Sequence, residues 1–196
     1  MIYLLRHGKV DLQGKKCFIG QTDLPLNSDG LRQARHWREK LRAIAFDGIY
    51  SSDLRRAVQT ARIITENSNT DIHVMPRLRE IHLGDWEGLP MSEIREIFPG
   101  EWRKRGENLE SYRPPGGESF ADLYARVVPV FRQIAEQSCE NRLIIAHAGV
   151  NRAILCYVLG MPLANLFRLG QDYGSLNLIE RKKDFFRIIA MNIQQI

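Results

Sequence analysis

A cation, an imidazole and a glycine stand next to one another near the start of the chain, as Arg6, His7 and Gly8. They directly follow an apolar run at residues 1–5. A short apolar run that ends in charge is typical of a buried strand that reaches the rim of a pocket. The glycine would let a substrate approach the backbone closely. The triplet therefore indicates a binding site for an anionic substrate beside a nitrogen nucleophile. A strand end with a solvated arginine and a capping histidine is the alternative.

Two further strand-like runs end in residues of the same kind. Residues 142–146 lead into residues 147–149 (His-Ala-Gly), and residues 46–50 lead into residues 51–57, which contain two adjacent arginines. Open α/β sheets bind their ligands at the carboxyl ends of the strands. We therefore expect the three strand ends to form one site along a single edge of a parallel sheet.

Helical patterns alternate with these strands. Apolar residues recur at helical spacing in segments 29–44, 52–66, 91–98, 119–137 and 150–159, and further strands are expected at 72–75, 175–180 and 185–190. We expect Ser52 to cap the second helix, Pro99 to end the third, and residues 119–122 to open the fourth with a capping box. The alternation predicts an α/β fold: a three-layer sandwich with a mostly parallel central sheet, helices on both faces and a terminal hairpin.

One long segment, residues 83–117, lacks strand signals and is rich in tryptophan, proline and glycine. We expect it to be an insertion that forms a lid over the carboxyl-terminal edge of the strands. Its aromatic residues Trp86, Trp102 and Tyr112 either stack on a ring of the substrate or anchor the loop by packing. The sequence leaves both interpretations open.

Length and composition predict one globular domain over residues 1–196, since 44% of the residues are hydrophobic. The net charge is +5, but the basic residues are scattered and form no long run, which disfavours nucleic acid as a partner. Cys17, Cys139 and Cys156 are odd in number and widely spaced, which argues against a disulfide framework and a metal cluster and favours the cytoplasm. No stretch approaches a membrane span or a signal peptide, so we expect no membrane partner.

Six short motifs follow one another along nearly the whole chain. They lie at residues 5–8 (L-R-H-G), 20–26 (G-Q-T-D-L-P-L), 51–61 (S-S-D-L-R-R-A followed by Q-T-A), 78–80 (L-R-E), 84–88 (G-D-W-E-G) and 145–149 (I-A-H-A-G). With these motifs, in this order, the chain resembles the histidine phosphatase superfamily, the phosphoglycerate mutase-like enzymes.

The resemblance implies that His7 is the nucleophile and that phosphoryl transfer to its imidazole gives a phosphohistidine, which divides one slow hydrolysis into two easier displacements. The nucleophilic nitrogen must be neutral. Arg6 and Arg56 disfavour a second positive charge nearby, so we expect them to push His7 towards its neutral form.

The family pattern also assigns the other catalytic groups. Arg6, Arg56 and His147 would clamp the phosphoryl oxygens, and Glu80 would act as the general acid and base. Since Arg55 and Arg56 are adjacent, only one can point inward, and the pattern selects the arginine directly before the alanine. The clamp supplies its own cations, so no metal ion and no cofactor is expected.

Further phosphate or substrate contacts are implied for a second group of residues: Gln13, Gly20, Gln21, Thr22 and Ala148. Gln13 stands where many relatives carry an asparagine that touches the phosphate. It keeps the amide but is one methylene longer, which leaves its role open.

Three features separate this chain from the mutases of the family. Mutases carry a longer insertion before residues 117–119, an aromatic residue in place of Leu83, and Gly-Asn in place of residues 148–149; this chain has none of these. A mutase must keep its phosphohistidine from water, whereas a phosphatase must admit water. The shorter lid favours a metal-independent phosphomonoesterase.

Within the phosphatases, residues 84–87 and 115–119 resemble those of α-ribazole phosphatases, which remove a 5′-phosphate from a nucleotide-like precursor in cobalamin assembly. The implied partner is a small phosphorylated metabolite such as α-ribazole 5′-phosphate; other sugar phosphates, phosphoglycerate or a phosphoprotein remain open. A mutase-type phosphoryl transfer and a non-catalytic module that binds phosphate or phosphopeptides are the alternative functions. Either a monomer or a homodimer fits.

Overall fold

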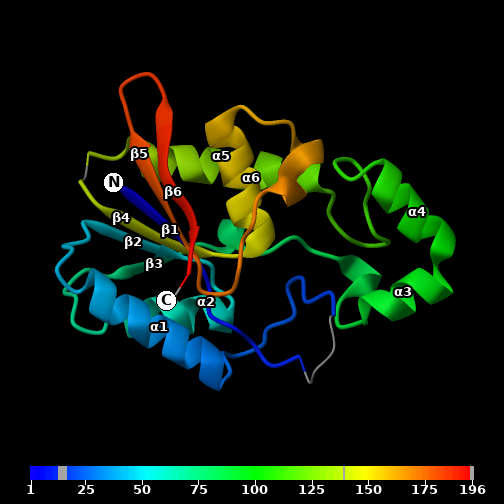
Figure 1. Ribbon diagram of the computed structural model, residues 1–196, viewed down its shortest axis with the longest axis horizontal. Coiled ribbons are helices and arrows are strands. Elements are labelled where there is room, and N and C mark those ends of the chain that lie inside the picture. Colours follow the sequence, from blue (N-terminus) through cyan, green and yellow to red (C-terminus); the bar gives the residue numbers. More distant parts are fainter. Residues whose placement is uncertain (13–16, 139, 195–196) are drawn as a thin grey trace.

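Six strands form one mixed sheet in the computed structural model, which describes residues 1–12, 17–138 and 140–194 (Figure 1). The strands are β1 (Ile2–Arg6), β2 (Gly48–Ser51), β3 (Ile72–Val74), β4 (Arg142–Ala146), β5 (Leu176–Arg181) and β6 (Phe186–Ile193). Their order is β3-β2-β4-β1-β5-β6. The first four are parallel, whereas β5 pairs antiparallel with both β1 and β6, as the predicted terminal hairpin requires. The carboxyl ends of β1, β2 and β4 therefore lie at one edge.

Four helices cover the two faces of this sheet. Helices α1 (Ser28–Leu41) and α2 (Arg55–Ile64) lie on one face, and α5 (Phe120–Glu136) and α6 (Ala148–Leu159) lie on the other (Figure 1). Because side chains alternate along a strand, β1 sends Leu4 into the core under α5 and α6 and Leu5 into the core under α1 and α2. The predicted three-layer α/β arrangement is confirmed. None of the helices in the described ranges is long and apolar enough to cross a membrane.

The segment predicted as a lid folds into short helices: η2 (Gly84–Trp86, a 3₁₀ turn), α3 (Met91–Ile97) and α4 (Pro99–Glu107). Helices α3 and α4 lie together at one end of the molecule, beyond the sheet on the side towards which β1 runs (Figure 1). The prediction that Pro99 ends a helix was half right. Helix α3 does stop before it, but Pro99 also begins α4, where its fixed φ suits the first helical position and its missing N–H costs nothing.

Trp86 packs in the core and does not stack on a substrate ring, which were the two possibilities for the aromatic residues of this segment. Its side chain is 1% exposed, and its ring lies 5.6 Å, centroid to centroid, from the rings of both Phe18 and Tyr112. Trp102 and Tyr112 are partly buried against the same core. Packing therefore explains Trp86, which has no exposed face to offer a substrate.

The start of α2 differs from the prediction. Ser52 is not its N-cap, because the helix begins at Arg55 and its cap residue, Leu54, has no side-chain acceptor. Instead the Oδ1 atom of Asp23 accepts a hydrogen bond from the backbone N–H of Arg55 at 2.7 Å. A carboxylate from a distant loop thus does the capping, and it fixes the helical turn that carries Arg56.

The start of α5 confirms the predicted capping box. The Ser119 hydroxyl accepts from the backbone N–H of Asp122 at 3.1 Å, and the Asp122 carboxylate accepts from the backbone N–H of Ser119 at 2.9 Å. Two further 3₁₀ segments complete the described helices, η1 (Pro76–Leu78) and η3 (Leu163–Arg168).

Candidate active site

Three of the predicted catalytic residues meet where the parallel strands end. His7 follows β1, His147 follows β4, and Arg56 lies in the first turn of α2, which follows β2. All three are buried, with exposed fractions of 3%, 0% and 1%. The imidazole centroids lie 5.0 Å apart. Arg55, the neighbour of Arg56, is exposed, so only one of the two adjacent arginines points inward, as expected.

The surroundings of His7 fix its protonation state. Its Nδ1 atom lies 2.7 Å from the carbonyl oxygen of Gly8, which can only accept, so Nδ1 carries the proton. The lone pair of Nε2 is then free to accept from the Nε–H of Arg56 at 3.2 Å. Burial, followed by the charges of Arg56 and Arg6, lowers the pKa of His7 well below its ordinary value. The ring is therefore neutral at pH 7, with its nucleophilic lone pair on Nε2.

Arg56 is held by backbone carbonyls at one end and faces both imidazoles at the other. Its Nη1 donates to the carbonyl of Thr22 and its Nη2 to the carbonyl of Gly20, both at 2.7 Å. Its Nε–H is shared between Nε2 of His7 and Nδ1 of His147, which lies 3.3 Å away. One N–H can serve two ring nitrogens only if neither is protonated, so Arg56 favours the neutral form of both rings.

Two buried nitrogen atoms of the site have no hydrogen-bond partner within the described ranges. They are Nε2 of His147 and Nε of Arg6. Because Nδ1 of His147 accepts, its ring proton is on Nε2. Burial, followed by the charges of Arg56, His7 and Arg6, lowers the pKa of His147 well below its ordinary value. A buried donor left unpaired costs about 1–3 kcal/mol, so both atoms are suited to an acceptor oxygen from a ligand.

Glu80 contributes the carboxylate of the site. It follows η1, and its side chain is fixed by two backbone donors, the N–H of Gly149 at 3.1 Å and the N–H of Ile81 at 2.9 Å. The absence of a side chain at Gly149 leaves room for this carboxylate, because a Cβ atom at this position would lie 2.4 Å from Oε1 of Glu80. Glu80 lines the same cavity as His7 and Arg56.

This cavity has a volume of about 310 Å³ and is lined by a charged group and an apolar group of residues. The polar side is formed by Arg6, His7, Arg56, Glu80 and Tyr173. The other walls are mostly apolar and come from Leu12, Cys17, Phe18, Ile19, Ile81, Leu83 and Met91. The cavity can thus hold an anion against its charged residues and an apolar part of the same ligand against its apolar residues.

The residues predicted to touch substrate are placed as follows. Gly20 lines the cavity, and Gln21 donates from Nε2 to the carbonyl of Glu80 at 3.1 Å. Thr22 holds Arg56 through its carbonyl, and Ala148 is the first residue of α6. Gln13 lies outside the described residues.

Glu87 ties this loop to the segment at residues 83–117, a role that motif matching did not reveal. Its Oε1 accepts from the backbone N–H of Gln21 at 2.8 Å and of Leu83 at 3.0 Å, and its Oε2 accepts from the hydroxyl of Thr22 at 3.3 Å. The one signal in the sequence was a carboxylate enclosed by the tryptophan and glycine of the fifth motif. Glu87 thereby holds the backbone that holds Arg56.

Tyr173 is the second site residue that sequence reasoning missed. It lies between η3 and β5, outside all six motifs, and no local pattern distinguishes it. In the structure its ring centroid lies 3.7 Å from Cζ of Arg6 and 5.6 Å from the ring centroid of His7.

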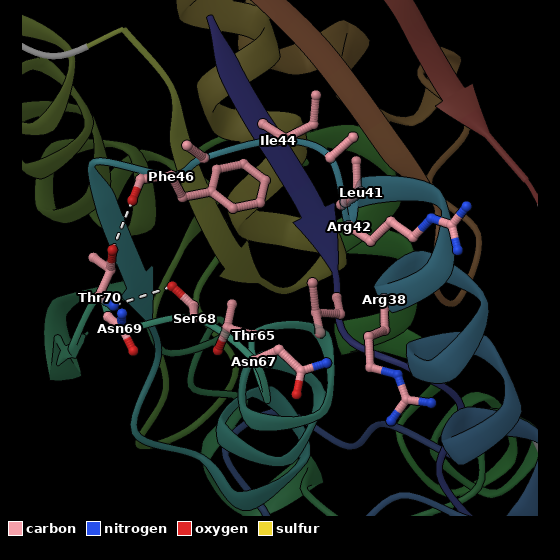
Figure 2. Close-up of a pocket in the computed structure, with 13 residues that line it drawn as sticks. Arg38, Leu41, Arg42, Ile44, Phe46, Thr65, Asn67, Ser68, Asn69 and Thr70 are labelled. Carbon is pink, nitrogen blue, oxygen red and sulfur yellow. Dashed lines mark hydrogen bonds between the residues drawn. The ribbon is translucent and has the colours of Figure 1, made fainter.

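Another pocket, of about 440 Å³, lies elsewhere on the chain and shares no lining residue with the active-site cavity (Figure 2). The end of α1, residues 41–46 and residues 64–70 surround it. Its Arg38 is paired with Glu39 and Glu66. None of the predicted catalytic residues lines this pocket, so the cavity at the strand ends is the candidate active site.

Comparisons with known proteins identify the family of the chain. The model of the histidine phosphatase superfamily (branch 1) matches residues 2–194. An adenosylcobalamin/α-ribazole phosphatase of Salmonella typhimurium is 29% identical over 192 residues, which are 97% of this chain and 95% of that protein. A glucosyl-3-phosphoglycerate phosphatase of Mycobacterium tuberculosis is 34% identical over 181 residues, 86% of this chain and 79% of that protein. The solved structure of the α-ribazole phosphatase from Shigella flexneri has a TM-score of 0.91 at 26% identity and covers 98% of this chain and 96% of its own. The chain therefore belongs to branch 1 of the histidine phosphatase superfamily and is a phosphatase of that superfamily.

Proposed function

We propose that this phosphatase hydrolyses phosphomonoesters through a phosphohistidine on Nε2 of His7 and needs no metal ion. The observation that carries the proposal is the buried, neutral imidazole of His7, whose Nε2 lone pair faces the Nε of Arg56 at 3.2 Å. A neutral imidazole nitrogen is a competent nucleophile at phosphorus. The cations that phosphoryl transfer requires are part of the chain itself.

In the first step, Nε2 of His7 attacks phosphorus and the bond from phosphorus to the leaving oxygen breaks. The protonated carboxyl of Glu80 gives its proton to that oxygen. In the second step, a water oxygen attacks phosphorus and Glu80 takes one of the water protons. The phosphorus–nitrogen bond then breaks and its electron pair returns to Nε2, which restores the starting state.

Arg56, Arg6 and His147 hold the phosphoryl oxygens during both steps. When Nε2 of His7 bonds to phosphorus, the Nε–H of Arg56 loses one of its two ring acceptors and can donate to a phosphoryl oxygen in its place. The buried, unpaired N–H groups of Arg6 and His147 can donate to further phosphoryl oxygens without reorganisation. Removal of one such donor typically costs roughly a hundred- to a thousand-fold in rate.

The proposed substrate is a small phosphorylated metabolite with an apolar portion, with α-ribazole 5′-phosphate as the first candidate. The apolar and charged groups of residues that line the cavity support a leaving group of this kind. The names of the relatives from Salmonella and Shigella support the specific choice. The mycobacterial relative makes a phosphorylated sugar acid the second compound to test.

We further propose that residues 83–117 act as a lid within one domain that spans residues 1–196. Leu83 and Met91 from this segment line the cavity, and Glu87 ties the segment to the loop beneath it. The free thiols of Cys17 and Cys156 support a reducing compartment such as the cytoplasm.

Turnover of an aryl phosphate in the presence of a chelator tests the reaction. We expect activity in the unaltered chain and its loss in His7→Ala, while His73→Ala, at an exposed position, serves as the control. An unchanged rate in His7→Ala would reject the nucleophile.

A kinetic screen of phosphomonoesters tests the substrate, and it should include α-ribazole 5′-phosphate. We expect kcat/KM to favour it over simple sugar phosphates by several decades. A flat profile would reject this substrate. Rapid conversion of 3-phosphoglycerate to 2-phosphoglycerate with catalytic bisphosphoglycerate, and little release of phosphate, would establish the mutase alternative instead.

A further inference from the structure

Arg6 is a partly buried arginine with no carboxylate counterion among the described residues. The side chain donates from Nη1 to the carbonyl of Gln171 at 2.7 Å, and its Nε has no partner. Across the described ranges, no carboxylate forms an ion pair with it. Burial lowers the pKa of Arg6. Something other than a salt bridge must therefore stabilise this guanidinium.

Tyr173 supplies a neutral alternative. Cζ of Arg6 lies 3.7 Å from the centroid of the Tyr173 ring, well inside the range in which an aromatic face attracts a cation. A carboxylate partner would occupy the in-plane N–H groups of Arg6 and repel an incoming anion. An aromatic face attracts the charge from above and leaves these donors available.

The backbone around Tyr173 is hydrogen-bonded to the end of β1. The N–H of Gly174 donates to the carbonyl of His7 at 3.0 Å, and the N–H of Arg6 donates to the carbonyl of Ser175 at 2.9 Å. The Tyr173 carbonyl itself accepts from Nε2 of Gln33 at 2.9 Å. Gly174 has a φ of +68°, a conformation that suits glycine and turns the chain back over β1. The ring is thus fixed relative to both Arg6 and His7.

We propose that Tyr173 is a positioning residue of the phosphate clamp: its ring stabilises the guanidinium of Arg6 from one face and fixes its plane so that Nε faces the phosphoryl group. The ring also confines the imidazole of His7, whose centroid lies 5.6 Å away at an interplanar angle of 61°. This inference rests on the proposed function, because it assumes that Arg6 binds the phosphoryl group. It adds a residue outside the six motifs on which that proposal was built.

Orthophosphate binding, measured by calorimetry, tests this role independently of turnover. A desolvated cation–π contact contributes about 2 kcal/mol, so Tyr173→Leu should weaken orthophosphate binding and lower kcat/KM for an aryl phosphate by about 10- to 30-fold. Tyr173→Phe keeps the aromatic face and should stay within about threefold of the original protein in both measurements. Tyr124→Leu, at another partly buried tyrosine that packs against the core away from the cavity, is the matched control.

A double-mutant cycle shows whether the ring acts through Arg6. In an Arg6→Gln background, which removes both the charge and the guanidinium group, Tyr173→Leu should cost less than about threefold. A loss of the same size in both backgrounds would overturn the inference, as would unchanged orthophosphate affinity in Tyr173→Leu.

Fluorinated phenylalanines at position 173 give a readout that does not depend on the folding of the leucine variant. They keep the shape of the ring while fluorine withdraws charge from its face. We expect orthophosphate affinity to fall stepwise with each added fluorine, and a constant affinity would overturn the inference. A chain that binds orthophosphate in this graded way but does not turn over any phosphomonoester would reject the proposed function and leave the role of Tyr173 intact.

Discussion

The Nε atom of Arg56 lies 3.2 Å from Nε2 of His7, and this contact joins the first turn of α2 to the end of β1. The same Nε lies 3.3 Å from Nδ1 of His147, at the end of β4. The contact with His7 orients the lone pair of that ring and excludes a proton from Nε2, and in the proposed mechanism it keeps a donor available for a phosphoryl oxygen. The carbonyls of Gly20 and Thr22 hold the other end of the guanidinium in place. The account of the active site therefore rests on how firmly this arginine and this imidazole are held.

The first prediction concerns the pH dependence of stability. Burial is the largest cause that lowers the pKa of both His7 and His147. Above about pH 6.5 both rings are neutral in the folded and in the unfolded chain. Below it, the unfolded chain binds protons that the folded chain resists, so the free energy of unfolding falls as the pH falls towards the lowered folded-state values. Each histidine should contribute a slope of about 1.4 kcal/mol per pH unit in that window.

Urea unfolding between pH 7.5 and 4.5 measures this slope. His7→Gln should lower the slope by the contribution of one histidine. His73→Gln, at an exposed position, should leave the slope unchanged. If His7→Gln has the same slope as the original chain, His7 is not buried in its neutral form.

The second prediction concerns the general acid. In Gly149→Ala the new Cβ would lie 2.4 Å from Oε1 of Glu80, so the carboxylate must move. Alkyl phosphates need a proton on their leaving oxygen, and we expect their kcat to fall roughly a hundred-fold. The loss for p-nitrophenyl phosphate, whose leaving group needs little help, should be much smaller.

Gly100→Ala is the matched control for this substitution. Nothing lies within 4 Å of a Cβ atom at position 100, and its φ is not positive. We expect this variant to keep full activity on both substrates. An equal loss on alkyl and aryl phosphates in Gly149→Ala would argue that Glu80 is not the proton donor.

The third prediction concerns Glu87. Its carboxylate accepts from two backbone N–H groups and one hydroxyl, and Glu87→Gln would replace one of the accepting oxygens with a donor. We expect a loss of about 1 kcal/mol in the free energy of unfolding, because a hydrogen bond to a charged acceptor contributes about 1.5–3 kcal/mol and one to a neutral acceptor about 0.5–1.5 kcal/mol. The loop that holds Arg56 would then be less firmly fixed. We expect kcat/KM to fall about tenfold, which is the effect of weakening one hydrogen bond to a charged group.

Thermal unfolding and steady-state kinetics measure both effects. Glu96→Gln, on the exposed side of α3, is the control and should change neither. A Glu87→Gln variant with lower stability and full activity would show that this loop does not position Arg56 for catalysis.

The fourth prediction separates two helix caps of similar strength. Asp23→Ala removes the acceptor for the N–H of Arg55, and Ser119→Ala removes the acceptor for the N–H of Asp122. Each should cost about 1 kcal/mol of stability. Only Asp23→Ala should also lower kcat/KM, because its helix carries Arg56. Equal activities in the two variants would show that the cap at α2 does not position the arginine.

Most of the fold could be predicted from local patterns. The apolar runs before His7 and His147 are strands because their residues alternate between two buried faces, and parallel strand ends necessarily share an edge. The capping box at Ser119 could be recognised because all of its partners lie within four residues. Such features depend on neighbours along the chain, and these are visible in a sequence.

The features that escaped prediction depend on distant partners. Asp23 caps a helix that begins 32 residues later, so the local candidate, Ser52, was the wrong choice. Pro99 satisfies the rule for ending one helix and the rule for beginning another, and only the packing of α3 and α4 decides between them. Tyr173 reaches Arg6 because contacts to Gln33 and His7 fold its loop back over the first strand.

The most direct test of the central claim is to trap the phosphoryl group during turnover. Rapid quenching into alkali, which preserves phosphohistidine, followed by peptide mass spectrometry, identifies the residue that carries it. The account predicts up to one phosphoryl group per chain, on His7, formed within the first turnover and absent from His7→Ala. A phosphoryl group on another residue, or full turnover with no phosphorylated chain at any time, would contradict it.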